Sequence, residues 1–174
     1  MLDHEQIKKL KAKRLCRDCV GESYLSDEIA TEGKRLKCSY CGSFRKCYRL
    51  NQLAERIEEV FEQHFVRTAT DPDPMQYAMM ADRESDYSWE RDGEQAVYAI
   101  MNAADIPEVA AQDIQKILED KHYNFDAATS GEETQFDSDS YYEAKGASDA
   151  AWQEEWRSFD VNRPAPDTVI GAEF

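Results

Sequence analysis

The sequence predicts a mostly α protein, in which a helical domain carries an N-terminal zinc ribbon-like module with four cysteine ligands. Two observations lead to this fold class. The first is a pair of cysteine motifs, Cys16-x-x-Cys19 and Cys38-x-x-Cys41, with the internal spacing of structural zinc sites. The second is a run from Leu50 onward in which apolar residues recur at steps of three and four, the period of an amphipathic helix.

The four cysteines are predicted to hold one structural Zn²⁺ ion. Two residues inside each pair let a tight turn direct both sulfurs at one metal, and the eighteen residues between the pairs let the second turn complete a tetrahedron. Disulfides and four unconnected buried thiols remain as alternatives. The N-terminus carries Asp3 and Glu5 and no apolar run typical of a signal peptide, which favours a cytoplasmic location and reduced thiols.

Cys47 stands outside the two pairs, directly before the long helical pattern. We expect it to be a buried structural thiol rather than a redox group or an alternate ligand, because free cysteine is among the most buried residue types.

The charge of the chain is strongly asymmetric. The net charge is −15, yet residues 1–50 hold twelve Lys and Arg against seven Asp and Glu, whereas residues 51–174 hold nine against twenty-nine. Part of the basic excess can balance a zinc–thiolate centre. The acidic remainder would repel a phosphate backbone, so we expect nucleic-acid contact, if any, only through Lys8, Lys9, Lys11, Lys13, Arg14, Arg45, Lys46 and Arg49.

The elements of the first half are predicted in order as follows. Residues 6–15 form a weak amphipathic helix or a basic arm. A short helix or a single turn is expected between the cysteine pairs, with its start favoured by Ser26 and Asp27 and its end by a positive φ at Gly33. The strongest helix begins near Leu50, with Asn51 as a plausible cap, and fades before Asp71-Pro-Asp-Pro74.

The second half is predicted to contain further helices joined by long connections. The apolar residues of 75–91 do not recur at a regular spacing, so this stretch is predicted to be irregular. Helices are expected over 94–103 and 107–120. Residues 121–146 read as a loop, but their aromatic side chains should anchor it on the helices. A last helix would start at Ser148 and bury Trp152, Trp156 and Phe159.

These elements suggest three segments. Residues 1–50 are the zinc ribbon-like module, 51–70 a connecting helix and 71–174 an acidic helical domain. Nothing in the chain approaches the roughly 20 consecutive apolar residues that a membrane span needs.

The sequence displays no catalytic motif. It has no glycine-rich phosphate loop, no Gly-x-Ser-x-Gly elbow and no His-Glu-x-x-His. His4, His64 and His122 lie in unrelated segments, and four cysteines would close the shell of a zinc ion, which indicates a structural metal. We therefore predict that this chain is not itself an enzyme.

Several segments together resemble the HEPN/RES N-terminal domain: the two cysteine pairs, Cys47-Tyr-Arg-Leu-Asn-Gln-Leu-Ala54, and the late acidic and aromatic run that ends at Trp152 to Phe159. The resemblance covers nearly the whole chain. It implies a zinc-containing bacterial module found ahead of RES toxin or HEPN ribonuclease domains, in toxin–antitoxin and phage-defence contexts. RES domains resemble ADP-ribosyltransferases that consume NAD, and no residue of this chain matches that part. The HEPN signature, an Arg followed by four to six residues and a His, is also missing, since seven residues separate Arg56 from His64.

Two functions follow as expectations. The first is a non-catalytic accessory or regulatory module that acts on a linked RES-type toxin domain or a protein partner through direct contacts. The alternative is a nucleic-acid-binding zinc ribbon that uses the basic residues of the first fifty, recognisable by binding that weakens steeply with salt.

Overall fold

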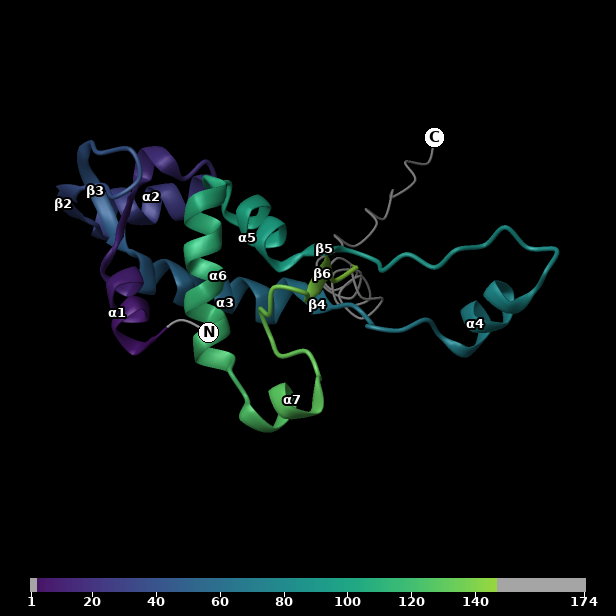
Figure 1. The fold of residues 1–174 in the computed structure, drawn as a ribbon. Helices are drawn as coiled ribbons and strands as arrows, with labels where there is room; N and C mark the ends of the chain where they lie inside the picture. Colours follow the sequence, from purple (N-terminus) through teal and green to yellow (C-terminus); the bar gives the residue numbers. More distant parts are fainter. Residues whose placement is uncertain (1–2, 147–174) are drawn as a thin grey trace, which may run out of the picture. The chain divides into compact units, whose positions relative to one another are not determined.

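The computed structural model describes residues 3–146, which contain seven α-helices, amounting to about half of the residues, and two three-stranded sheets (Figure 1). The helix predicted to bury Trp152, Trp156 and Phe159 lies outside the described residues. The helices are α1 (His4–Ala12), α2 (Ser23–Glu32), α3 (Leu50–His64), α4 (Pro74–Ala81), α5 (Ala96–Ala104), α6 (Glu108–His122) and α7 (Phe125–Ser130). The strands are β1 (Arg14–Cys16), β2 (Lys34–Lys37), β3 (Phe44–Arg49), β4 (Phe65–Arg67), β5 (Glu94–Gln95) and β6 (Tyr141–Ala144), and a short 3₁₀ helix, η1 (Arg17–Cys19), follows β1.

The first sheet organises the cysteine-bearing part of the chain. Its order is β1-β3-β2, with both neighbours antiparallel to β3. The register places Cys16 opposite Cys47 and Lys37 opposite Phe44. Both cysteine pairs therefore leave the sheet at the same end, one at the end of β1 and the other in the turn from β2 to β3.

Helix α3 confirms the long helical pattern. Its buried face consists of Leu50, Leu53, Ala54, Ile57, Glu58 and Phe61. The cap expected at Asn51 is wrong, because the helix already starts at Leu50 and Arg49 takes the cap position. The Asn51 side chain instead donates to Glu55 Oε1 at 2.7 Å, a contact between side chains four apart on the helix surface.

Helix α2 is a full helix of ten residues rather than a single turn. Its cap is Glu22, whose carboxylate accepts from the backbone N–H groups of Tyr24 and Leu25, and not Ser26. Gly33 ends the helix with φ at −64°, so the predicted positive φ is wrong. A glycine is needed there for space, since a Cβ would lie 2.3 Å from the Ile29 carbonyl oxygen.

Helix α6 is the centre of the helical packing. It packs against α1, α3 and α5, and in Figure 1 it runs across α3. It buries Ala110, Ala111, Ile114, Ile117 and Leu118. The helix expected over 107–120 is confirmed, and it starts at Glu108 with Pro107 as its cap.

A second sheet and an aromatic cluster join the later part of the chain to α3. Strand β6 pairs with both β4 and β5 in antiparallel order. Phe136 and Tyr142 are buried and contact Phe61, which itself stacks on Phe65 with ring centroids 4.4 Å apart. The prediction that aromatic residues anchor the 121–146 segment is confirmed for these two side chains.

Two helices were missed in stretches predicted to be irregular or loop-like. Helix α4 forms inside 75–91 because Asp73 caps it and Pro74 occupies its first position. Helix α7 forms inside 121–146 with Asn124 as its cap and Gly131 in the left-handed conformation after its end. Neither helix buries a residue, which explains why neither shows a hydrophobic period.

Residues Met1–Ala144 form one compact unit. Within it, α1 packs against both α3 and α6, so the N-terminal part is in direct contact with helices of the later segments. The three-part division into 1–50, 51–70 and 71–174 stays a prediction. No helix in the described part of the chain is both long enough and apolar enough to cross a lipid bilayer.

Candidate metal centre

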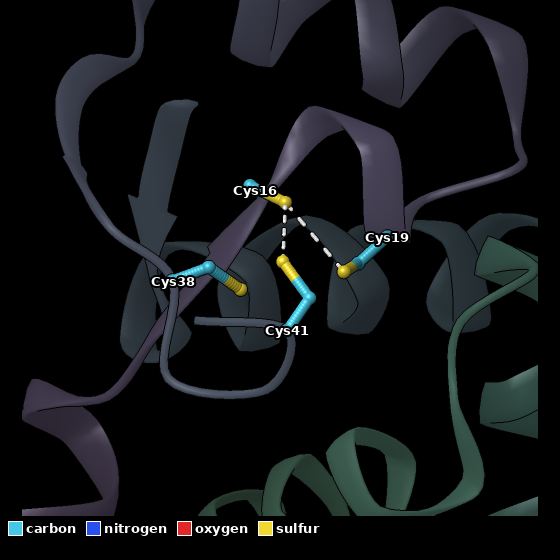
Figure 2. A group of neighbouring side chains, drawn as sticks. All are labelled: Cys16, Cys19, Cys38 and Cys41. Carbon is cyan, nitrogen blue, oxygen red and sulfur yellow. Dashed lines mark hydrogen bonds between the residues drawn. The ribbon is translucent and has the colours of Figure 1, made fainter. Parts of the chain in front are cut away.

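The sulfurs of Cys16, Cys19, Cys38 and Cys41 converge on one point, and all four lie within 4.8 Å of one another. Figure 2 shows the four side chains pointing toward a common centre from two separate turns. Cys16 ends β1 and Cys19 ends η1, while Cys38 and Cys41 lie in the turn between β2 and β3. Cys16 and Cys38 are buried, Cys19 is half-buried and Cys41 is exposed.

The sulfur separations fit metal ligation and not disulfides. Cys16 Sγ lies 3.5 Å from Cys19 Sγ and 3.6 Å from Cys41 Sγ. A disulfide requires about 2.05 Å, whereas four sulfurs about 2.3 Å from a tetrahedral zinc ion lie roughly 3.8 Å apart. Four thiol donors in this arrangement suit a soft or borderline ion such as Zn²⁺. The structure thus shows a possible metal site.

The local turn around Cys38 is built for a ligand sulfur. The backbone N–H of Tyr40 donates to Cys38 Sγ at 3.4 Å. Gly42, which follows Cys41, has φ at +74° and donates from its N–H to the Cys38 carbonyl at 3.2 Å. Gly42 therefore closes the turn through the backbone, because a side chain at this φ would be strained.

Gly21 does not play the same part for the first pair. Its N–H donates to the Asp105 carbonyl after α5 at 2.8 Å. An added Cβ would lie 1.8 Å from the Asp105 carboxylate. Gly21 is thus a point of close approach between the chain after η1 and the end of α5.

The surroundings alone do not make all four thiols anionic. Burial raises the pKa of Cys16 to about 11 and also raises that of Cys19. Hydrogen bonds with the backbone and side chain of Ser43 lower the pKa of Cys41 to about 6. A divalent cation at the centre would supply the charge that keeps all four sulfurs as thiolates.

Tyr40 links the cysteine turn to helix α6. Its hydroxyl donates to Asp113 Oδ2 at 2.7 Å, and Lys13 Nζ donates to the same oxygen at 2.6 Å. The Lys13 ammonium also lies over the Tyr40 ring, 5.6 Å from its centroid. Asp113 is buried, and burial together with this carboxylate raises the pKa of Tyr40. No sequence pattern indicates this connection, because 73 positions separate the tyrosine from the aspartate.

Cys47 is buried as predicted and is not part of the sulfur cluster. Its thiol contacts the carbonyl oxygens of Leu36 and Arg45 at 3.4 and 3.3 Å, and burial raises its pKa. Within residues 3–146 no other group of three or more His, Cys, Asp or Glu side chains brings its ligand atoms together.

The eight basic residues of the nucleic-acid alternative do not all line one groove. Four of them line a single groove: Lys8, Lys11, Arg14 and Arg49. The others lie elsewhere or are engaged: Lys13 pairs with Asp113, Arg45 pairs with Asp18 at 3.0 Å, Lys46 contacts the Thr31 carbonyl, and Lys9 is exposed on α1.

The histidines likewise remain apart from the sulfurs. His122 Nε2 lies 2.6 Å from Glu58 Oε1, and Lys121 pairs with the other oxygen of the same carboxylate. This cluster joins α3 to the end of α6, and sequence reasoning missed it because its members lie more than sixty positions apart.

Comparison with known protein families, curated proteins and solved structures returns no match. The resemblance to the HEPN/RES N-terminal domain stays a prediction.

Proposed function

We propose that this chain is a non-catalytic accessory module whose zinc ribbon-like part is fixed by Zn²⁺ at Cys16, Cys19, Cys38 and Cys41. The observation that carries the proposal is the convergence of four sulfurs within 4.8 Å. Four protein ligands complete a tetrahedral shell and leave no open position for a substrate or a reactive water. The chemistry supplied by the ion is therefore structural.

The protein side of this centre explains how a metal at one end of the first sheet would affect the helices. The turn that carries Cys38 and Cys41 also carries Tyr40, which holds Asp113 on α6. The chain that leaves Cys19 is hydrogen-bonded through Gly21 and Glu22 to the end of α5. Fixing the two turns thus fixes two contacts with the helical part of the unit. Structural zinc sites of this kind contribute about 10–16 kcal/mol of apparent binding free energy to folding.

A matched pair of cysteine variants tests the metal proposal. Cys41→Ser removes an exposed ligand without opening a cavity, and Cys47→Ala alters the fifth cysteine, which is outside the cluster. We expect purified Cys41→Ser to lose most of its zinc and unfold at lower urea concentration, while Cys47→Ala keeps one zinc per chain. Loss of zinc in both variants, or in neither, would contradict the assignment of the ligands.

We further propose that the module acts through contacts with a RES-type, NAD-consuming toxin domain encoded with it. The resemblance of the sequence supports this, and so does a surface suited to a partner. Helix α4 is apolar yet buries none of its residues, and its exposed side chains include Met75, Tyr77, Met79 and Met80. Exposed apolar side chains gathered on one short element are typical of interaction surfaces.

The test is a growth assay with the toxin domain expressed beside the module. A double variant, Met79→Ser with Met80→Ser, should change toxicity or targeting as much as deletion of the module does. Phe125→Ser is the matched control, because Phe125 is 70% exposed on a different helix. Toxicity that is unchanged by deletion of the module would refute the functional proposal and leave the metal proposal standing.

A further inference from the structure

A broad groove lies between α1, β2, β3 and the first turn of α3, apart from the sulfur cluster. Its volume is about 1020 Å³. Five cationic side chains line it and only one carboxylate does, that of Glu32; the cations are Lys8, Lys11, Arg14, Lys34 and Arg49. In Figure 1 the elements that form the groove lie together at the left of the picture. The sequence could not show this gathering, since Lys8, Lys11 and Arg14 precede the first cysteine pair, whereas Lys34 and Arg49 come from β2 and the end of β3.

The charge of this groove is not balanced by the described residues. Lys11 pairs with Asp120 at 3.5 Å, and the other four cations have no ion pair within residues 3–146. The Glu32 carboxylate accepts a hydrogen bond from the Tyr48 hydroxyl at 3.0 Å. Outside the groove, Lys13 and Arg45 each have an acidic partner, and Lys9, Arg35, Lys37 and Lys46 have no ion pair within residues 3–146. Unpaired cations in a concave surface raise the local concentration of anions.

Arg14 lines the groove and carries an unsatisfied donor. Its Nε is buried, and it has no hydrogen-bond partner in the described structure. A buried N–H of a guanidinium that lacks an acceptor is costly. This atom is closed to solvent, so a phosphate would be bound by the terminal amino groups of the guanidinium fork, whose geometry matches phosphate oxygens.

The lining of the groove and the charge of the remaining chain favour a compact anion over a nucleic-acid strand. The one aromatic residue in its lining, Tyr48, is 5% exposed, so no ring is available for a nucleic-acid base to stack on. Residues 51–174 hold twenty-nine acidic against nine basic residues, which would repel phosphates that run beyond the groove. A compact anion avoids this repulsion, because charges separated by more than about 8 Å are largely screened at physiological salt.

We infer that this groove binds a compact ligand that carries two or more phosphate groups. The guanidinium groups of Arg14 and Arg49 each donate two hydrogen bonds to phosphate oxygens. Lys8, Lys11 and Lys34 add positive charge around the ligand. This inference goes beyond the proposed function, and it does not depend on a toxin partner.

The experiment titrates inorganic pyrophosphate into the zinc-loaded full chain by calorimetry, at about 0.05 and 0.15 M salt. We expect saturable binding with a stoichiometry near one that weakens with salt. Arg14→Gln and the more exposed Arg49→Gln should each weaken it about tenfold or more. Arg45→Gln is the matched control, since Arg45 lies outside the groove and pairs with Asp18. Zinc content and far-UV circular dichroism verify that each variant is folded.

Three outcomes would overturn the inference. The first is no saturable heat with pyrophosphate up to millimolar concentration. The second is equal weakening in Arg45→Gln, which would indicate a general charge effect. The third is preference for a ten-residue single-stranded oligonucleotide over pyrophosphate, with affinity that grows with oligonucleotide length, which would establish the nucleic-acid alternative instead.

Discussion

The substitution Tyr40→Phe tests whether the cysteine turn is coupled to helix α6. Tyr40 lies between Cys38 and Cys41, and its hydroxyl donates to Asp113 at 2.7 Å. The Asp113 side chain is only 9% exposed, so water cannot easily replace a lost donor. The variant removes one oxygen atom and leaves the ring and its contact with Lys13 in place.

The magnitude follows from the partners of Asp113. A hydrogen bond to a charged group contributes about 1.5–3 kcal/mol. Lys13 remains bound to the same carboxylate oxygen at 2.6 Å, so the charge is not left without a partner and the larger cost of an unpaired buried ion does not apply. We therefore expect Tyr40→Phe to lower the free energy of unfolding by about 2 kcal/mol.

Urea unfolding of the zinc-loaded protein at pH 7 measures this change. The slope against urea should stay constant, because the exposed area is the same. Tyr24→Phe is the matched control: Tyr24 is 77% exposed, and its loss of a hydroxyl should change stability by less than about 0.5 kcal/mol. The reasoning fails if the two tyrosine variants are equally stable.

A double-mutant cycle sharpens the result. Lys13→Met combined with Tyr40→Phe leaves Asp113 without either donor. The pair of changes should therefore cost more than the sum of the single ones, by about 0.5–3 kcal/mol. Simple additivity would indicate that the two donors do not share one carboxylate.

Three further changes probe the core, the end of helix α2 and the charged cluster. Phe136→Ala removes a ring that is 2% exposed and should cost about 3–5 kcal/mol in urea unfolding. Gly33→Ala would place a Cβ 2.3 Å from the Ile29 carbonyl oxygen and should lower the thermal midpoint by several degrees. Burial would raise the pKa of Glu58, but hydrogen bonds from Lys121 and His122 outweigh it and hold the pKa below its usual value. Glu58 therefore stabilises the fold above its unfolded pKa of about 4.3, and the advantage of wild type over Glu58→Gln should shrink as acid is added below that pH.

Each of these three substitutions has a control variant or an outcome that would contradict the prediction. Phe125→Ala, at a ring that is 70% exposed, should be nearly neutral, and equal losses at Phe125 and Phe136 would argue against the aromatic cluster. For Gly146→Ala, the added Cβ meets no atom of residues 3–146 within 4 Å, so this change should leave the midpoint unchanged, unlike Gly33→Ala. For Glu58, a stability difference from the glutamine variant that is constant from about pH 7 to pH 3 would contradict the lowered pKa.

The sequence could predict those features of the fold and the site that depend on residues close together in the chain. The spacing of the cysteine pairs is enough to expect four sulfurs at one point, and the geometry brings them together. Helix α3 shows its buried face through Leu53, Ile57 and Phe61 at steps of four. In both cases the information lies in residues close together in the chain.

The parts that sequence missed depend on partners far along the chain or on exposed elements. The strands of both sheets are two to six residues long, too short to show an alternating pattern. Helix α4 has a cap but no buried face, so only Asp73 and Pro74 indicated it. The contact of Tyr40 with Asp113 and the basic groove arise only when distant segments meet, and no spacing rule exists for them.

X-ray absorption at the zinc edge of the protein as purified tests the central claim most directly. The account predicts one zinc per chain, coordinated by four sulfurs at about 2.3 Å with no nitrogen or oxygen ligand. Protein that contains no stoichiometric zinc, or a zinc ion with fewer than four sulfur ligands, would contradict it.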